Sequence, residues 1–192
     1  PHITDEVAYW LHARFLAAGA LTLPAPPVPE AFELYLMQVK DDEWYAATPP
    51  GWPALLALGS RLGLPWLVNP LLAGLCLLLT YYLIRALYDR HVALMVVLLL
   101  CTSPWFLFMS MNLMTHTFTL ACALAGAVLV DRARQSGRVL PAGLAGVLVG
   151  VGSTIRPLDG LLVGVLLGLW ALGVGGQRLK LASLGTFGLG AI

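Results

Sequence analysis

Charged side chains are scarce in this sequence. Only 11% of its 192 residues are Asp, Glu, Lys or Arg, whereas 59% are hydrophobic and the mean hydropathy is +0.82. Soluble domains carry about 25% charged residues, so the composition excludes an ordinary soluble domain and predicts an integral membrane protein. The net charge is only +1, which gives no basis for binding to nucleic acid.

Cysteine and the common nucleotide motifs are also sparse or absent. Cys76, Cys101 and Cys122 lie inside apolar runs, and their spacing matches no metal or redox motif. Their odd number argues against a disulfide framework, so we interpret them as small buried hydrophobic residues. The sequence contains no Walker motif, Rossmann fingerprint or HExxH. It therefore gives no indication of direct nucleotide binding.

Long apolar runs dominate the chain after residue 66. A membrane helix needs about 20 mostly apolar residues, and tilted or shielded helices can be shorter. The candidate spans are Leu67–Tyr88, Val92–Phe108, Thr115–Val130, Leu140–Ile155 and Leu158–Leu172, with a sixth beginning near Leu179. We therefore predict an all-α, polytopic transmembrane helix bundle over residues 67–192. Since the chain starts at Pro1 and stops inside an apolar stretch, we expect it to be a piece of a longer protein.

The basic residues predict an orientation. Alternate connections between the spans carry Arg85, Arg90, Arg132, Arg134, Arg138, Arg178 and Lys180. By the positive-inside rule these connections face the cytoplasm. The opposite ends of the spans, with most of the acidic residues, are then extracytoplasmic, as expected for a multi-pass protein of the cell membrane.

Residues 1–66 form the predicted first extracytoplasmic loop, with two short interfacial helices. In TDEVAYWLHARFLAAG one helical face is apolar and the other polar: Val7, Trp10, Leu11 and Phe15 against Asp5, Tyr9 and His12. This pattern is typical of a helix that lies in the membrane interface. The Pro-rich LPAPPVP is expected to prevent regular structure, and TPPGWPALLALGSRLG predicts a second helix with Pro53 near its first turn. Loops of this length are often functional.

The adjacent carboxylates Asp5 and Glu6 have two compatible interpretations. Thr4 could cap the first helix, and acidic residues in a first turn interact favourably with the helix dipole. Alternatively, one carboxylate accepts a proton from an acceptor hydroxyl, or binds a divalent cation. The residues alone leave both open.

Arg156 and His116 are the other candidate site residues. Arg156 interrupts the apolar stretch VGVGSTIRPLDGLLVG on the extracytoplasmic side. Ionisable residues near membrane depth tend to be functional, and a guanidinium binds phosphate bidentately. The alternative is an ion pair with Asp159, three residues along. His116 lies in SPWFLFMSMNLMTHTF, which contains no charged residue, and is either an interfacial residue or a contact for a phosphate or metal.

Five motifs in a fixed order carry a resemblance to a known group of proteins. They are the acidic pair (TDEVAYW), YAATPPGWPALLALGSRLG, an Asn-Pro at the head of a span (WLVNPLL), a Ser-Pro (CTSPWFLFMS) and an Arg-Pro (STIRPLDGLL). In this order the chain resembles the membrane glycosyltransferases of the GT-C fold. It is most similar to the bacterial group related to protein O-mannosyltransferases and the lipid A aminoarabinose transferase.

The resemblance implies a function and a site. Such enzymes move a sugar from a polyprenyl-phosphate carrier to a lipid, glycan or protein acceptor at the outer membrane face. The family's acidic residue in the first outer loop corresponds to Asp5, with Glu6 beside it, at the catalytic centre. Arg156 and, more loosely, His116 would hold the donor phosphate. Some members bind a divalent cation and others show none.

Two other classes of function are alternatives to a glycosyltransferase. A transporter or lipid flippase would favour broken helices and polar groups at the bilayer midplane. Here the middles of the spans are almost purely Leu, Val, Ala and Gly, and the polar groups lie at the outer boundary. A non-catalytic membrane scaffold would leave Asp5, Glu6 and Arg156 replaceable. The pattern favours a transferase.

Overall fold

The computed structural model describes residues 3–32, 34–173 and 181–191. Helices dominate these residues: α1 Thr4–Ala17, α2 Gly51–Arg61, α3 Val68–Leu87, α4 Arg90–Thr102, α5 Pro104–Met111, α6 His116–Ser136, α7 Val139–Ile155, α8 Pro157–Ala171 and α9 Leu181–Ala191. Two short 3-10 helices are η1 Pro29–Phe32 and η2 Pro65–Leu67, and three strands are β1 Thr22–Pro24, β2 Met37–Lys40 and β3 Glu43–Ala46. The predicted helical bundle is therefore present, and the N-terminal loop adds a small sheet to it.

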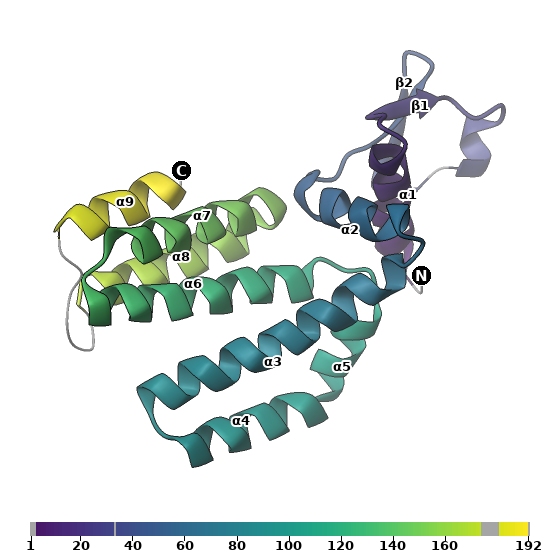
Figure 1. The fold of residues 1–192 in the computed structure, drawn as a ribbon. Coiled ribbons are helices and arrows are strands. Elements are labelled where there is room, and N and C mark those ends of the chain that lie inside the picture. Colours follow the sequence, from purple (N-terminus) through teal and green to yellow (C-terminus); the bar gives the residue numbers. More distant parts are fainter. Residues whose placement is uncertain (1–2, 33, 174–180, 192) are drawn as a thin grey trace.

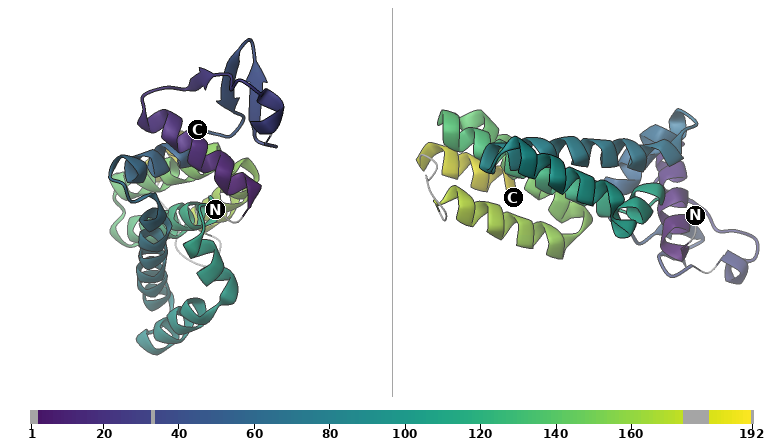
Figure 2. Two further views of the ribbon diagram at one scale, coloured as in Figure 1. Left: turned by 90° about the vertical axis from the view of Figure 1, so that its right-hand side faces the viewer. Right: turned by 90° about the horizontal axis from the view of Figure 1, so that it is seen from below.

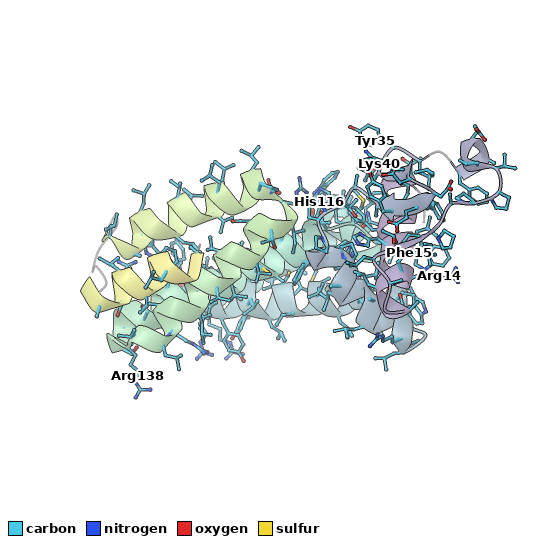
Figure 3. The ribbon with its side chains drawn as sticks, turned by 90° about the horizontal axis from the view of Figure 1, so that it is seen from above. Arg14, Phe15, Tyr35, Lys40, His116 and Arg138 are labelled. Atoms are coloured by element: carbon cyan, nitrogen blue, oxygen red, sulfur yellow. The ribbon has the colours of Figure 1, made fainter. Side chains whose placement is uncertain are left out.

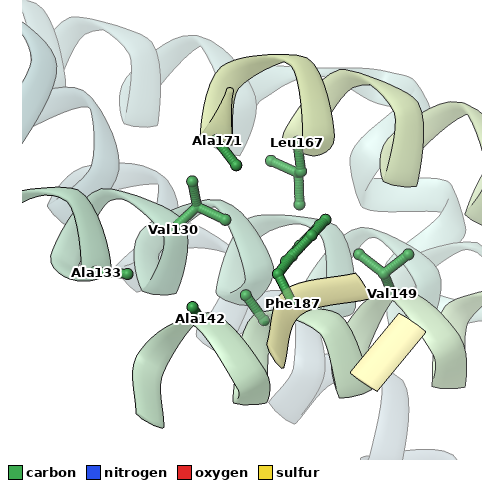
Figure 4. Close-up of a cluster of buried hydrophobic side chains, with 8 residues drawn as sticks. Val130, Ala133, Ala142, Val149, Leu167, Ala171 and Phe187 are labelled. Atoms are coloured by element: carbon green, nitrogen blue, oxygen red, sulfur yellow. The ribbon is translucent and has the colours of Figure 1, made fainter. Parts of the chain in front are cut away.

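The helices from α3 onward form a layered bundle, and α1, α2 and the sheet lie at one of its ends (Figure 1). Within the bundle α7 packs against α6, α8 and α9, while α3 packs against α4 and α6. Figure 4 shows the main core, in which Phe187 of α9 meets Val130 of α6, Val149 of α7 and Leu167 of α8. Figure 2 shows from two sides how α1 lies across the end of the bundle.

Small residues allow the helices of this core to approach closely. A Cβ added at Gly146 of α7 would collide with the main-chain oxygen of Phe187, and one at Gly160 of α8 would collide with Ser153 of α7. One at Gly164 would lie 3.0 Å from Val149. Gly160 and Gly164 of α8 thus lie on a packing surface, as close helix approach in membranes requires.

The lengths of the helices bear on the predicted spans. Among the described residues, η2 and α3 together make one apolar helix of 23 residues, Pro65–Leu87, which is long enough to cross a membrane. The pair α4 and α5 passes the same test only when taken together. The apolar helices α7 and α8 are shorter, with 17 and 15 residues. All five predicted segments are helical, and five complete membrane crossings remain a prediction.

The predicted span Val92–Phe108 is not one straight helix. The chain bends by 63° between α4 and α5. Ser103 has extended backbone angles there, with φ −67° and ψ 117°, because the ring of Pro104 disfavours a helical conformation in the residue before it. Pro104 then begins α5, where its missing N–H is harmless.

The two ends of the bundle differ in charge. Arg85 and Arg90 flank the α3–α4 connection, and Arg132, Arg134 and Arg138 flank the α6–α7 connection, all at the end remote from α1. Figure 3 shows Arg138 at that end, with His116 toward the other. This separation fits the predicted orientation, although Arg178 and Lys180 lie outside the described residues.

Helix α1 differs from its prediction in two respects. It begins at Thr4, with Ile3 in the N-cap position and no side-chain cap, so the prediction that Thr4 caps the helix is wrong. Both of its faces are also covered. Glu6 and His12 are buried together with Ala8, Ala13 and Phe15, because α2 packs against one side of α1 and β3 against another. A simple division into an apolar and a polar face therefore does not describe it.

The sheet was not predicted. Its order is β1-β3-β2 and both pairings are antiparallel. Asp41 and Asp42 form the turn between β2 and β3, with φ of 54° and 61°, as a two-residue type I′ turn requires. Trp44 of β3 packs edge-on against Phe15 of α1 and against Phe32 of η1, with ring centroids 5.5 and 5.8 Å apart. This aromatic contact attaches the sheet to α1.

Candidate functional site

Polar side chains from three separate parts of the chain meet where α1 lies against the end of the bundle. Tyr9 of α1 is central, since its side chain hydrogen-bonds with Thr115 and lies within electrostatic range of both Asp5 and Arg156. Arg156 also acts electrostatically on His116. We call this group the Tyr9 cluster: Asp5, Tyr9, Thr115, His116 and Arg156. It contains three of the four residues that the sequence singled out.

Asp5 and Tyr9 share one face of α1 because they are four residues apart. Asp5 lies in the first turn of the helix and is half-exposed. Burial raises the pKa of the Tyr9 phenol, and the Asp5 carboxylate raises it further, whereas Arg156 and the hydrogen bond with Thr115 lower it. The net pKa is above its usual value, so Tyr9 keeps its proton at neutral pH and serves as an O–H donor.

Glu6 is placed differently from Asp5. Its side chain is 1% exposed, and successive residues on an α-helix point about 100° apart. The two carboxylates therefore diverge and do not form a ready-made chelate. Within the described residues, no group of three or more His, Cys, Asp or Glu side chains could hold a metal ion. Asp5 and Glu6 thus do not act together as a chelating pair in this structure.

Arg156 connects α7 to α8 and occupies an extended conformation, with φ −135° and ψ 90°. Its Nε lies 2.6 Å from Oδ2 of Asp159, so the predicted ion pair is confirmed. The Arg156 side chain is 33% exposed. A guanidinium has five N–H donors, and an ion pair through Nε leaves others that can bind an anion. The ion pair therefore orients Arg156 without using all of its donors.

His116 is the first residue of α6. Its Nδ1 is buried and has no hydrogen-bond partner among the described residues. The ring meets Trp105 of α5 edge-on, with centroids 6.3 Å apart. A cavity of about 220 Å³ lies beside it between α5 and α6, lined by Trp105, Phe106, Met109, His116, Thr117 and Leu120. His116 thus connects the Tyr9 cluster to an apolar cavity.

The turn before α6 is held by two side chains that the sequence analysis assigned no role. Asn69, at the head of α3, donates from Nδ2 to the main-chain oxygens of Asn112 and Met114. Trp52 of α2 donates from Nε1 to the oxygen of Leu113 over 2.9 Å. Both donors are 0% exposed. The Asn-Pro and Pro-Pro-Gly-Trp motifs contained these residues, but their partners are too distant in sequence to be inferred.

The position of α1 is fixed by a buried polar contact. Nδ1 of His12 lies 2.8 Å from the hydroxyl of Thr48, which precedes α2. Burial lowers the pKa of His12, so its imidazole is neutral at pH 7 and can share a hydrogen bond with a hydroxyl. At the start of α2, Gly51 approaches Ile155 so closely that a Cβ would lie 2.9 Å from its side chain. Through α2, helix α1 is thus packed against α7, next to Arg156.

The cysteines take no part in this site. Cys76 and Cys122 are buried, Cys101 is partly buried, and all three are free thiols. The interpretation as small buried hydrophobic residues thus holds for Cys76 and Cys122, while Cys101 is only partly buried.

A comparison with known protein families matches the part of the chain that contains most of the Tyr9 cluster. Residues 48–192 match the family model described as dolichyl-phosphate-mannose-protein mannosyltransferase. The matched region includes His116 and Arg156 and the two residues that hold the turn, Trp52 and Asn69; Asp5 and Tyr9 precede it. Neither the curated proteins nor the solved structures gave a significant match.

Proposed function

This chain belongs to the dolichyl-phosphate-mannose-protein mannosyltransferase family and is a membrane glycosyltransferase, and on that premise we propose that it transfers a sugar from a polyprenyl-phosphate carrier to an acceptor hydroxyl. One observation supports this proposal above the others. Asp5 and Arg156, of opposite charge, both lie within range of Tyr9 at a single end of the helix bundle. A carboxylate and a guanidinium are the groups that hydroxyl activation and phosphate departure require.

In this proposal Asp5 is the general base. The acceptor oxygen attacks the anomeric carbon of the sugar, and its proton passes to the Asp5 carboxylate. The bond between that carbon and the phosphate oxygen breaks, and its electron pair leaves with the polyprenyl phosphate. A single displacement of this kind inverts the configuration at the anomeric carbon. Asp5 suits the role better than Glu6 because it is half-exposed and shares the face of Tyr9, whereas Glu6 is buried.

Arg156 stabilises the departing phosphate. Negative charge develops on the phosphate oxygens as the bond breaks, and fixed donors stabilise such charge most in a site shielded from water. Arg156 is held by Asp159 at 2.6 Å, so its remaining donors keep a defined direction. His116 lies next to Arg156 and to the apolar cavity, where it would contact the same phosphate. Tyr9 joins α1 to Thr115 and so keeps Asp5 near these donors.

The distribution of charge supports an extracytoplasmic location for the site. The Tyr9 cluster lies at the end of the bundle opposite to Arg85, Arg90, Arg132 and Arg138. Connections rich in arginine stay in the cytoplasm. The acceptor, a lipid, glycan or protein, would therefore be modified on the outer face of the cell membrane.

A transfer assay with the full-length protein tests this function. The protein, in lipid vesicles, is given a labelled polyprenyl-phosphate sugar and a set of acceptors. We expect Asp5→Asn to lower the transfer rate by at least about a hundredfold, as loss of a general base does. Asp41→Asn is the matched control, because Asp41 is exposed in the β2–β3 turn and its positive φ suits Asn.

The outcomes are distinct. Equal transfer by the wild type and Asp5→Asn would remove Asp5 from the mechanism. No transfer by a folded wild type from any polyprenyl-phosphate sugar would contradict the proposed function and favour the transporter or scaffold alternatives.

A further inference from the structure

The N-terminal sheet has an unpaired edge beside a hollow. Among the described residues the order is β1-β3-β2, so strand β2 has a neighbour on one side only. A hollow of about 530 Å³ is lined by all four residues of β2, by Tyr45 of β3 and by Pro29, Glu30 and Phe32 of η1. Successive residues of a strand point to opposite faces of the sheet. Because the hollow touches residues of β2 that point to both faces, it reaches the outer edge of the strand, and it also extends over one face as far as Tyr45.

The geometry of the hairpin shows which main-chain groups face this hollow. A two-residue turn makes Lys40 and Glu43 a hydrogen-bonded pair, so the next pair, Val39 and Trp44, is not hydrogen-bonded. The N–H and C=O of Val39 therefore point away from β3. The position of Trp44 agrees with this assignment. Its N–H and C=O point away from β2 and face Leu23 of β1.

The outward groups of Val39 are accessible. Among the described residues no further main-chain hydrogen bond reaches Val39, whereas the N–H of Met37 is already bonded to Leu34. The Val39 side chain is 41% exposed. Exposed strand edges of this kind are templates for a further strand.

We infer that the outer edge of β2 docks an extended segment of a polypeptide acceptor, which adds to the sheet as a fourth strand. This inference rests on the proposed function and names the acceptor class. Main-chain hydrogen bonds to Val39 supply the pairing, as in other cases of strand addition. Glu30 and Lys40, of opposite charge and both exposed, line the same hollow and select for acceptor segments of complementary charge.

The sheet lies at a useful distance from Asp5. Trp44 contacts Phe15, which is ten residues along α1 from Asp5. At 1.5 Å per residue the helix covers about 15 Å over that length. An extended peptide covers about 3.3 Å per residue, so roughly five residues separate the docked segment from the acceptor hydroxyl at Asp5. A peptide held at β2 can therefore present a Ser or Thr to the site.

The test compares two substitutions at one position in the full-length protein. Val39→Pro removes the outward N–H, and proline is tolerated in edge strands; Val39→Ala keeps the N–H. One acceptor is a Ser-containing peptide of about ten residues, which is long enough to reach both β2 and Asp5. The other is a short Ser peptide that cannot reach both. For the long peptide we expect Val39→Pro to raise KM several-fold, up to about tenfold, as loss of one main-chain hydrogen bond does, with kcat unchanged. Val39→Ala and the short peptide should show no change.

A charge exchange tests the same site without altering the backbone. Lys40→Glu should raise KM for an acidic long peptide and lower it for a basic one. Anisotropy of a fluorescent long peptide with the protein in nanodiscs measures docking directly, even if no transfer occurs.

The two proposals can fail separately. Transfer to peptides with the same KM in all variants would overturn docking at β2 and leave the proposed function intact. Sensitivity of a glycan acceptor, but not of a peptide, to Val39→Pro would overturn the assignment of a polypeptide. Peptide binding without transfer by any variant would contradict the function and not the docking.

Discussion

Trp52 donates a 2.9 Å hydrogen bond to the main-chain oxygen of Leu113, sixty-one positions along the chain. The bond joins α2, in the N-terminal part, to the turn that precedes α6. Thr115 and His116 follow directly after that turn. The position of two members of the Tyr9 cluster thus depends on a helix that contributes no polar side chain to it.

Trp52→Phe should lower the transfer rate more than it lowers stability. The phenyl ring keeps most of the packing of a residue that is 0% exposed, but the oxygen of Leu113 loses its donor. Loss of one such bond costs about 1 kcal/mol. The transition temperature and kcat are measured together. Trp66→Phe is the control, since Trp66 is 61% exposed; an equal loss of kcat in both variants would contradict this role.

Arg156 and Asp159 can be separated by substitution. If Arg156 binds the donor phosphate, Arg156→Lys should lower kcat/KM for the donor at least about tenfold, because an ammonium cannot replace a bidentate guanidinium. Asp159→Asn should have a smaller effect, since the 2.6 Å ion pair is half-exposed and such pairs contribute about 0–1 kcal/mol. Equal losses in the two variants would indicate that the ion pair alone matters.

The pH dependence of stability should report on His12. Burial holds its pKa below the usual 6.5, so the folded state binds a proton less readily than the unfolded chain. The contribution of neutral His12 to the free energy of unfolding is complete above about pH 6.5. It is lost as the pH falls through the lowered folded-state pKa. We therefore expect the transition temperature to fall on acidification, and less steeply in His12→Gln. His91→Gln, at an exposed position, should follow the wild type; identical slopes in all three proteins would refute the assignment.

Because α7 packs closely against α9, we expect the addition of one methyl group there to lower stability strongly. In Gly146→Ala the new Cβ would collide with the main-chain oxygen of Phe187, and overpacking typically costs about 1–3 kcal/mol. Gly74→Ala in α3 adds the same group where no atom lies within 4 Å. We expect a lower transition temperature for Gly146→Ala only. A similar loss in Gly74→Ala would point to a general intolerance of glycine replacement.

The sequence predicted the features that depend on local pattern. Apolar runs located the helices from α3 onward, and the spacing of Arg156 and Asp159 predicted their ion pair. The order of five weak motifs identified the glycosyltransferase family, which the match over residues 48–192 confirms. Each of these predictions depends on residues that are close together in the sequence, or on a sequence pattern that can be recognised without knowing the tertiary contacts.

Long-range contacts explain what was missed. Tyr9 was assigned to a helix face, but nothing in the sequence placed it beside Thr115 and Arg156. The β2–β3 hairpin was not predicted, because Asp41-Asp42 is a less familiar type I′ turn than Asn-Gly. His12 was expected on a polar face, and it is buried because α2 and β3 cover α1 from different sides. Only the folded chain shows this.

If the donor is lipid-linked as proposed, the bend at Ser103 affects how it would reach the enzyme. Helix α4 has 13 residues and is about 20 Å long, shorter than the roughly 30 Å hydrocarbon layer. If its arginine-flanked start lies at the inner surface, α4 ends inside the bilayer, and α5 turns aside there to form the cavity next to His116. A lipid-linked sugar would then approach laterally, without leaving the membrane. The rate would depend on the mole fraction of donor in the bilayer, so dilution with inert lipid would slow the enzyme at constant bulk concentration.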